Sequence, residues 1–181
     1  MRAFIGITLT KQIQQKVSRI QAKIRKIGAD VKYVERENLH ICLRFLGDID
    51  KNQLGAVKRA LERGLEGEKE LELKITAVGA FPNNNHIRVL WVGVEKGLEK
   101  FVEKINKELQ EEGFEMPPGK FRGHITLGRV KTAKNKEKLQ EMFKTRPCEG
   151  NMKVHVKEIG IFSSTLTKAG PFYKQEFVVN L

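Results

Sequence analysis

The chain has 181 residues, of which 40% are hydrophobic and 31% are charged, a composition that is typical of a globular protein and excludes a disordered one. Its 34 Lys and Arg residues outnumber its 22 Asp and Glu residues and give a net charge of +12 at pH 7. That charge favours a polyanionic partner, nucleic acid first, although the Lys- and Glu-rich surface of a thermophilic protein explains it equally well.

In chain order, the first half alternates strands with two amphipathic helices. Residues 11–27 and 50–65 carry apolar side chains every three or four positions, the spacing of a helix that buries one face. Gly28 marks the end of the first helix, because glycine is common just beyond a helix C-terminus. Apolar and alternating runs predict strands over 2–9, 31–34, 40–46, 71–81 and 87–94, with an Asn-rich turn at 82–85.

The second half repeats this layout. Helices are predicted over 97–112 and 134–144, with a strand over 121–130 between them. Two long strands, 152–162 and 172–179, close the chain, and the composition of 163–171 predicts a loop between them.

The order helix, strand, helix, strand, strand therefore occurs twice. This repeat predicts an α+β fold over 1–181: a single domain of two pseudo-symmetric lobes with mostly antiparallel sheets and helices on the outer faces. In such a fold the strands over 40–46 and 121–130 are expected to face one another across a central cleft.

Two short segments of the chain resemble each other. Residues 38–43 read Asn-Leu-His-Ile-Cys-Leu, and residues 122–127 read Arg-Gly-His-Ile-Thr-Leu. Side chains alternate between the two faces of a strand, so each histidine shares a face with the residue two positions later, and the intervening apolar residues point into a core. Two histidines presented in the same way, His40 and His124, predict a site in which one imidazole accepts a proton while the other donates one.

The residues that follow the histidines leave several interpretations open. The hydroxyl of Thr126 could donate a hydrogen bond to a phosphate oxygen, or Thr126 could simply be a strand-forming residue. Cys42 could be a weaker donor, a small core residue, a nucleophile activated by His40, or one ligand of a metal site whose other ligands are not recognisable. The chain has only one other cysteine, Cys148, and no CxxC spacing, which fits a reducing compartment.

Phe45 and Arg129 each lie five residues after a motif histidine. Odd spacing on a regular strand places a side chain on the opposite face, unless a bulge at Gly128 returns Arg129 to the histidine face. There its guanidinium could grip a phosphate, and Phe45 could stack on a base instead of packing in the core. The other histidines, His86 and His155, are expected on an exposed turn and an exposed strand face.

Together these motifs resemble the 2H phosphoesterases, and more narrowly the RNA 2′,3′-cyclic phosphodiesterases, also called 2′-5′ RNA ligases. The similarity extends over nearly the whole chain, with Phe-Leu-Gly after the first motif and Gly-Arg after the second. The matching segments are 2–7, 38–47, 89–94, 124–129, 162–166 and 170–173.

The resemblance implies a bilobal fold that uses no metal and no cofactor, with His40 and His124 as the catalytic pair. Thr126 and Arg129 would hold the phosphate, and Phe45 would contact the terminal base. Cys42 would occupy the place of the family's usual Thr or Ser in the phosphate site.

The implied reaction is hydrolysis of RNA 2′,3′-cyclic phosphate ends to 2′-phosphates, with His124 as base and His40 as acid, and with reversible 2′-5′ ligation when an RNA hydroxyl replaces water. The implied protein is a cytoplasmic monomer that binds RNA and no membrane. Two other functions remain open: an RNA-binding module without catalysis, and a phosphodiesterase for small cyclic nucleotides.

Overall fold

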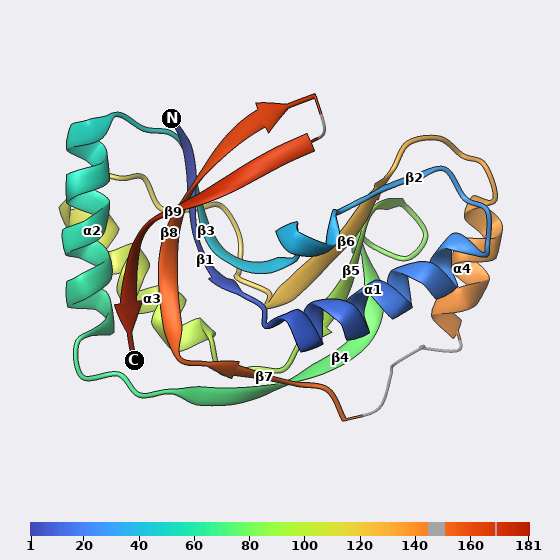
Figure 1. The fold of residues 1–181 in the computed structure, drawn as a ribbon, viewed down its shortest axis with the longest axis horizontal. Coiled ribbons are helices and arrows are strands. Elements are labelled where there is room, and N and C mark those ends of the chain that lie inside the picture. Colours follow the sequence, from blue (N-terminus) through green and yellow to red (C-terminus); the bar gives the residue numbers. More distant parts are fainter. Residues whose placement is uncertain (145–150, 169) are drawn as a thin grey trace.

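The computed structural model describes residues 1–144, 151–168 and 170–181 (Figure 1). Its elements are, in chain order, β1 (Arg2–Thr8), α1 (Lys11–Arg25), β2 (Val31–Tyr33), the 3₁₀ turn η1 (Arg36–Asn38), β3 (His40–Asp48), α2 (Lys51–Leu65), β4 (Leu71–Pro82), β5 (Ile87–Val94), α3 (Glu99–Glu111), β6 (His124–Val130), α4 (Lys136–Lys144), β7 (Lys153–Val156), β8 (Glu158–Thr167) and β9 (Gly170–Asn180). Apart from the last two strands, the predicted elements are present with ends shifted by up to three residues.

The strands of the described residues form one sheet in the order β7-β4-β5-β6-β3-β1-β8-β9, and β2 pairs with β6 beside this path. Every pairing is antiparallel, as the repeat predicted. The helices α2 and α3 lie at one end of the molecule and α1 and α4 at the other (Figure 1). The two lobes of the predicted α+β fold are therefore confirmed.

The helix ends have local causes that are visible in the sequence. The Thr10 hydroxyl accepts a hydrogen bond from the Ile13 N–H and caps α1, and Gly28 adopts a φ of +73°, which suits the chain reversal after this helix. Asp50 and Gln53 form a reciprocal capping box at the start of α2. Both helices then bury their apolar stripe, as their 3–4 spacing predicted.

Two predictions for the end of the chain are wrong. The strand predicted over 152–162 divides at Lys157, because β7 pairs with β4 whereas β8 pairs with β1. The predicted loop over 163–171 is largely the arms of a hairpin, in which Thr165 lies opposite Phe172 and the Thr167 hydroxyl donates to the Gly170 carbonyl. Its Ser and Thr residues suggested a loop by composition, but strand pairing determines their conformation here.

The two halves of the chain exchange parts between the lobes. In the first lobe, β3 and α2 come from the first half, whereas α3, β8 and β9 come from the second. In the second lobe, α1 comes from the first half of the chain. It packs beside β6 and α4, which both come from the second half. The Gln21 side chain fixes α1 there, because its amide donates to the Leu127 and Val34 carbonyls, both at 2.9 Å. Each lobe is thus built from both repeats, and we propose that 1–181 form a single domain.

Candidate active site

The two motif strands meet at the centre of the sheet. β3 pairs with β6 at Ile41 and Ile125, and both of these side chains are fully buried. Leu43 and Leu127, two positions further along each strand, are buried as well. The core-facing half of each motif is therefore confirmed. The two motif strands, expected on either side of a central cleft, also touch directly at this one pair, so the lobes join where the motifs lie.

The polar half of each motif lies on the other face of this joint. Continuing the register by one residue in each direction places His40 opposite Thr126 and Cys42 opposite His124. All four side chains are half-buried, so they are partly shielded from solvent but remain accessible to a substrate. The two histidines are diagonal neighbours, a relation in which residues lie roughly 7–8 Å apart and their Cβ atoms somewhat closer. The structure therefore brings together the four motif residues that the sequence singled out.

A bulge in β6 returns Arg129 to the histidine face. Thr126 pairs with Trp91 of β5, but Gly128 pairs with Leu90, so two residues of β6 advance against one of β5. This extra residue reverses the alternation that would otherwise place Arg129 on the core side. The side chain of Arg129 is exposed. The bulge at Gly128, which the sequence left open as an alternative, is therefore present.

Glycine is required at the bulge because β2 packs directly against it. A Cβ at Gly128 would lie 2.7 Å from Cγ1 of Val31 and 2.9 Å from the Lys32 carbonyl oxygen, both closer than atoms can approach. The bulge, and hence the placement of Arg129, depends on this missing side chain.

β3 contains the matching bulge. Cys42 pairs with Gly6 of β1, whereas Arg44 pairs with Ile5, so the register shifts one position after the motif, as in β6. Phe45 consequently emerges on the histidine side with 52% of its surface exposed, rather than packing in the core. The guanidinium of Arg2 lies over its ring at 5.1 Å. Arg2 is a site neighbour that sequence reasoning missed.

Backbone carbonyls orient the two imidazoles identically. Nδ1 of His40 lies 2.7 Å from the Asn38 carbonyl oxygen, and Nδ1 of His124 lies 2.7 Å from the Arg122 carbonyl oxygen. A carbonyl can only accept, so Nδ1 carries the proton in each ring and donates it. Nε2 is then the atom of each ring that can take up or release a proton.

Aromatic side chains enclose each imidazole. The rings of Phe4 and Tyr173 lie 4.7 and 5.2 Å from the His40 ring, centroid to centroid. Phe81 lies 4.9 Å from the ring of His124 and meets it edge to face. These contacts hold the two rings in place. The sequence assigns no role to any of the three, although Tyr173 lies in one of the segments that carry the family resemblance.

The pKa values of both histidines are lowered. Burial is the main cause for each, and the hydrogen bond to the backbone carbonyl partly opposes it. The charge of protonated His124 lowers the pKa of His40 further, which shows that the two rings interact electrostatically. A state with one neutral and one protonated imidazole is therefore favoured over a doubly protonated state.

The Cys42 thiol is protonated at neutral pH. Burial raises its pKa to about 11, and the Arg44 N–H opposes this only partly. A buried neutral thiol is a poor nucleophile and a poor metal ligand, which argues against two of the interpretations left open above. No group of three His, Cys, Asp or Glu residues that could hold a metal ion occurs among the described residues.

A cavity of about 370 Å³ opens beside the histidines. It is bounded by Cys42 and His124 from the motif strands, by Phe81 and Pro82 at the end of β4, and by the segment 120–122. On the other side, the Asn38 amide donates to the Pro171 carbonyl at 2.8 Å and ties the β8–β9 hairpin to the first motif. The hairpin thereby holds Tyr173 against His40.

Tyr173 also lies within electrostatic reach of Arg129. Burial and the neighbouring Cys42 raise the pKa of its phenol, whereas Arg129 and Arg2 lower it. This places Arg129 near the His40 side of the site. The two remaining histidines lie elsewhere: His86 is exposed in the Asn-rich turn, and His155 is exposed on β7, with its Nε2 3.0 Å from a Glu70 carboxylate oxygen. Both predictions are confirmed.

A pair of equivalently oriented histidines on a two-lobed antiparallel α+β fold defines a 2H phosphoesterase. The chain matches the LigT-like phosphoesterase family over residues 7–91 and 92–173, and it belongs to that family. Each match covers one of the two sequence repeats. The described residues contain no helix that is long and apolar enough to cross a membrane.

Relatives are similar over nearly their whole length. RNA 2′,3′-cyclic phosphodiesterase of Methanothermobacter thermautotrophicus is 34% identical, with 100% of this chain and 99% of the relative covered. The Thermotoga maritima protein of the same name is 37% identical, with 96% and 92% covered. A Thermus thermophilus structure, 23% identical, superposes with a TM-score of 0.82 and covers 100% of this chain and 98% of its own. E. coli LigT complexed with 3′-AMP, also 23% identical, gives 0.81 with 99% and 97% covered.

The electrostatic coupling of the two imidazoles can be measured directly. We expect the ring signals of His40 and His124 to titrate below the ordinary pKa of about 6.5 in NMR spectra, because burial disfavours the charged form. In His124→Asn the pKa of His40 should rise, because the neighbouring like charge is removed. An unchanged His40 titration in that variant would show that the rings are not coupled.

Proposed function

We propose that this chain is a metal-independent phosphodiesterase that hydrolyses RNA 2′,3′-cyclic phosphate ends to 2′-phosphates. The observation that carries the proposal is the pair of Nε2 atoms of His40 and His124, both made available by an Nδ1 hydrogen bond to a backbone carbonyl. The names of the relatives support the substrate, since they are called RNA 2′,3′-cyclic phosphodiesterases.

The paired imidazoles account for both proton transfers of this reaction. Water attacks phosphorus in line with the ribose 3′ oxygen, and one neutral imidazole takes the proton that the water loses. The bond from phosphorus to the 3′ oxygen breaks, and the other, protonated imidazole gives its proton to that oxygen. The product carries a 2′-phosphate and a 3′-hydroxyl. Before a second turnover, the ring that acted as base must release its proton to solvent, and the ring that acted as acid must take one up.

We assign His124 as the base and His40 as the acid. In this assignment neutral His124 takes the proton that the water loses, and protonated His40 gives its proton to the ribose 3′ oxygen. These are the roles that the resemblance to the 2H phosphoesterases implies.

The phosphate lies between the two motifs in this proposal. The Thr126 hydroxyl, opposite His40, donates to a phosphate oxygen, and the Arg129 guanidinium neutralises the negative charge on the phosphate oxygens. Cys42 takes the corresponding position beside His124 with a weaker donor. Phe45, exposed at the edge of the site, stacks on the terminal base.

Three further features belong to the proposal. An RNA 5′-hydroxyl in place of water would form a 2′-5′ bond by the same proton transfers, although abundant water makes hydrolysis dominant. One chain supplies both histidines, so the protein acts as a monomer. The free thiol of Cys42 suits the reducing cytoplasm. An RNA-binding module without catalysis would not need two imidazoles held in the same orientation.

The reaction is tested by its product. Purified protein in excess EDTA should convert an oligoribonucleotide with a 2′,3′-cyclic phosphate end to the 2′-phosphate isomer, because no step uses a metal. Separation of the product from synthetic 2′- and 3′-phosphate standards checks this. Loss of activity on chelation, restored by zinc or manganese, would contradict metal independence, and a 3′-phosphate product would contradict the assigned leaving group.

Removing either motif histidine should abolish most of the activity. His40→Ala and His124→Ala should each lower kcat about a hundredfold to ten-thousandfold, the range for a general acid or base. His86→Ala and His155→Ala, which alter exposed histidines outside the site, should leave kcat nearly unchanged. Circular dichroism verifies that each variant is folded, and near-normal turnover by a folded motif variant would refute the two-histidine mechanism.

Substitutions of Cys42 separate a phosphate contact from a nucleophile. Cys42→Thr should keep or raise kcat, because a hydroxyl is the better donor, and Cys42→Ala should cost little. Thr126→Ala should cost up to about 3 kcal/mol in the activation barrier, since it withdraws a preorganised donor. Steady-state kinetics on a nucleoside 2′,3′-cyclic phosphate decides between the two roles. An inactive Cys42→Thr with both histidines in place would restore the nucleophile.

A further inference from the structure

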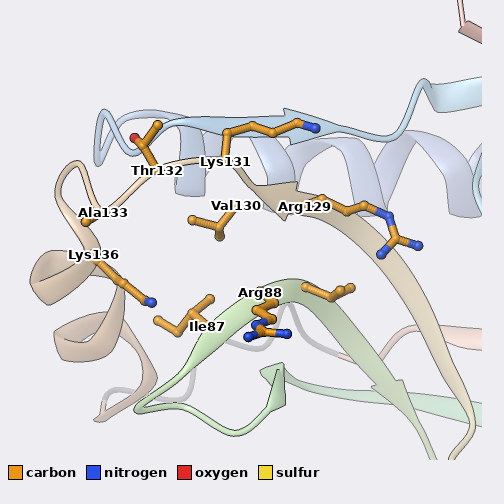
Figure 2. Close-up of a pocket in the computed structure, with 9 residues that line it drawn as sticks. Ile87, Arg88, Arg129, Val130, Lys131, Thr132, Ala133 and Lys136 are labelled. Atoms are coloured by element: carbon orange, nitrogen blue, oxygen red, sulfur yellow. The ribbon is translucent and has the colours of Figure 1, made fainter.

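A basic groove lies beside the catalytic site, at the far end of β6. It has a volume of about 590 Å³, and its walls come from the start of β5, the end of β6 with the loop that follows, and α4 (Figure 2). We define the groove by its four cationic side chains, Arg88, Arg129, Lys131 and Lys136. Lys136 extends from α4 into the gap, whereas Arg129 and Lys131 extend from neighbouring positions on the opposite wall (Figure 2). None of the described residues that line it is acidic.

The cations of the groove have no carboxylate partner among the described residues. No ion pair within those residues involves Arg88, Arg129, Lys131 or Lys136. Asp30 lies close to Lys131, but its backbone carbonyl, not its carboxylate, accepts from the Lys131 N–H.

The α2–α3 face at the other end of the molecule differs in this respect. There Arg59 and Arg63 pair with Glu108 and Glu112 at 2.6–2.9 Å, and further pairs join Lys100 and Lys104 to Glu68. A surface that serves only stability would balance its charges in this way, and the groove does not. The four cations of the groove therefore form a cluster next to the site that no carboxylate of the described residues compensates.

The strand register places like charges side by side in this region. Lys32 of β2 lies directly opposite Arg129 of β6, and both side chains are exposed. Like charges in directly opposite positions destabilise a pair of strands. A bound anion between them would turn this repulsion into attraction, so the arrangement fits an anionic ligand better than it fits the free sheet.

The walls of the groove are fixed before any ligand binds. The Asn135 amide, one residue before α4, donates to the carbonyls of Ile27 and Gly28 at 3.1 Å, and the Gln140 amide of α4 donates to the Asn85 carbonyl at 3.0 Å. These contacts tie α4 both to the end of α1 and to the β4–β5 turn. The cations therefore need little reorganisation to act together.

The groove is continuous with the catalytic site through Arg129, which lines the groove and also acts electrostatically on Tyr173 beside His40. Arg129 lies three residues after Thr126, and Lys131 lies two residues further on. The two cations therefore lead away from the phosphate position in steps of about 7–10 Å. Such a row matches the repeated phosphates of a single nucleic-acid strand rather than one isolated anion.

We propose that the groove binds the phosphodiester backbone of the RNA strand that precedes the cyclic end. This inference rests on the proposed function, which places the terminal phosphate beside Thr126 and Arg129. It makes the enzyme selective for oligonucleotides over nucleoside 2′,3′-cyclic monophosphates, because only an oligonucleotide presents phosphates to Lys131, Lys136 and Arg88. The neighbouring cation Lys32 extends the same surface.

The test compares two double variants with the same net charge. Lys131→Ala/Lys136→Ala removes two groove cations, and Lys51→Ala/Lys107→Ala removes two exposed cations from α2 and α3 at the other end of the molecule. Each is assayed for kcat/KM on a cyclic-ended decaribonucleotide and on a nucleoside 2′,3′-cyclic monophosphate. Fluorescence anisotropy measures binding of a labelled decaribonucleotide with a 2′-phosphate end at several salt concentrations.

We expect the groove variant to lose about tenfold in kcat/KM and in affinity on the decaribonucleotide, and to keep wild-type kinetics on the mononucleotide. The slope of log affinity against log salt should fall by about 0.7 for each of the two phosphates that the variant can no longer neutralise. The control variant should match wild type. Oligonucleotide binding that is unchanged in the groove variant, or weakened equally in the control, would overturn the groove assignment.

The anisotropy measurement distinguishes a failure of this proposal from a failure of the proposed function. If the wild-type protein hydrolyses neither substrate, the proposed function fails, yet anisotropy still decides whether the groove holds RNA. If the wild-type protein hydrolyses both substrates and the groove variant binds RNA normally, the enzyme assignment stands and the groove proposal fails.

Discussion

The pairing of β3 with β6 is the constraint on which the rest of the structure depends. These two strands join the lobes, and the pair Ile41–Ile125 seals the joint on the core side with fully buried side chains. Because strand faces alternate, burying these two residues forces both motif histidines onto the opposite face. A slip of one residue in either strand would bury a histidine and expose an isoleucine. The hydrophobic core thus sets the register, and the register brings the two imidazoles together.

Backbone hydrogen bonds and bulges then orient the histidine rings and the side chains around them. A carbonyl two residues before each histidine orients the ring, and a bulge after each motif directs Phe45 and Arg129 to the same side. These features are symmetric because the two repeats are equivalent, but the side chains they present are not: one bulge delivers an aromatic ring and the other a guanidinium. A symmetric scaffold can therefore hold an asymmetric substrate, with a base at one end and a phosphate at the other.

Much of this site could be predicted from the sequence, because its determinants are local. The two motifs, their strand periodicity and the glycine at the second bulge are all contained within short segments. They sufficed to place His40, His124 and Thr126 on one face and to offer a bulge as one of two possibilities for Arg129. The register shift in β3 that exposes Phe45 is not marked by a glycine at the shift, unlike the bulge in β6. The residues alone therefore do not decide whether Phe45 lies in the core or at the site.

Other features depend on contacts between distant segments and could not be predicted. The exchange of helices between the lobes involves long-range contacts such as that of Gln21 with Leu127, 106 residues away. Tyr173 reaches His40 because the described residues of 163–171 lie mostly in the arms of a hairpin, whereas the composition suggested a loop. The basic groove combines side chains from β5, β6 and α4, and the net charge alone did not reveal where uncompensated cations would gather.

The central claim is that His40 and His124 act as one acid–base pair, and the pH dependence of kcat/KM tests it most directly. The wild-type protein should give a bell-shaped profile on a nucleoside 2′,3′-cyclic phosphate, with limbs that belong to the coupled pair. The residual activity of His40→Ala should lose the limb that falls at high pH, and that of His124→Ala the limb that falls at low pH, since each variant lacks one partner. A bell of unchanged shape in either single variant would contradict the account.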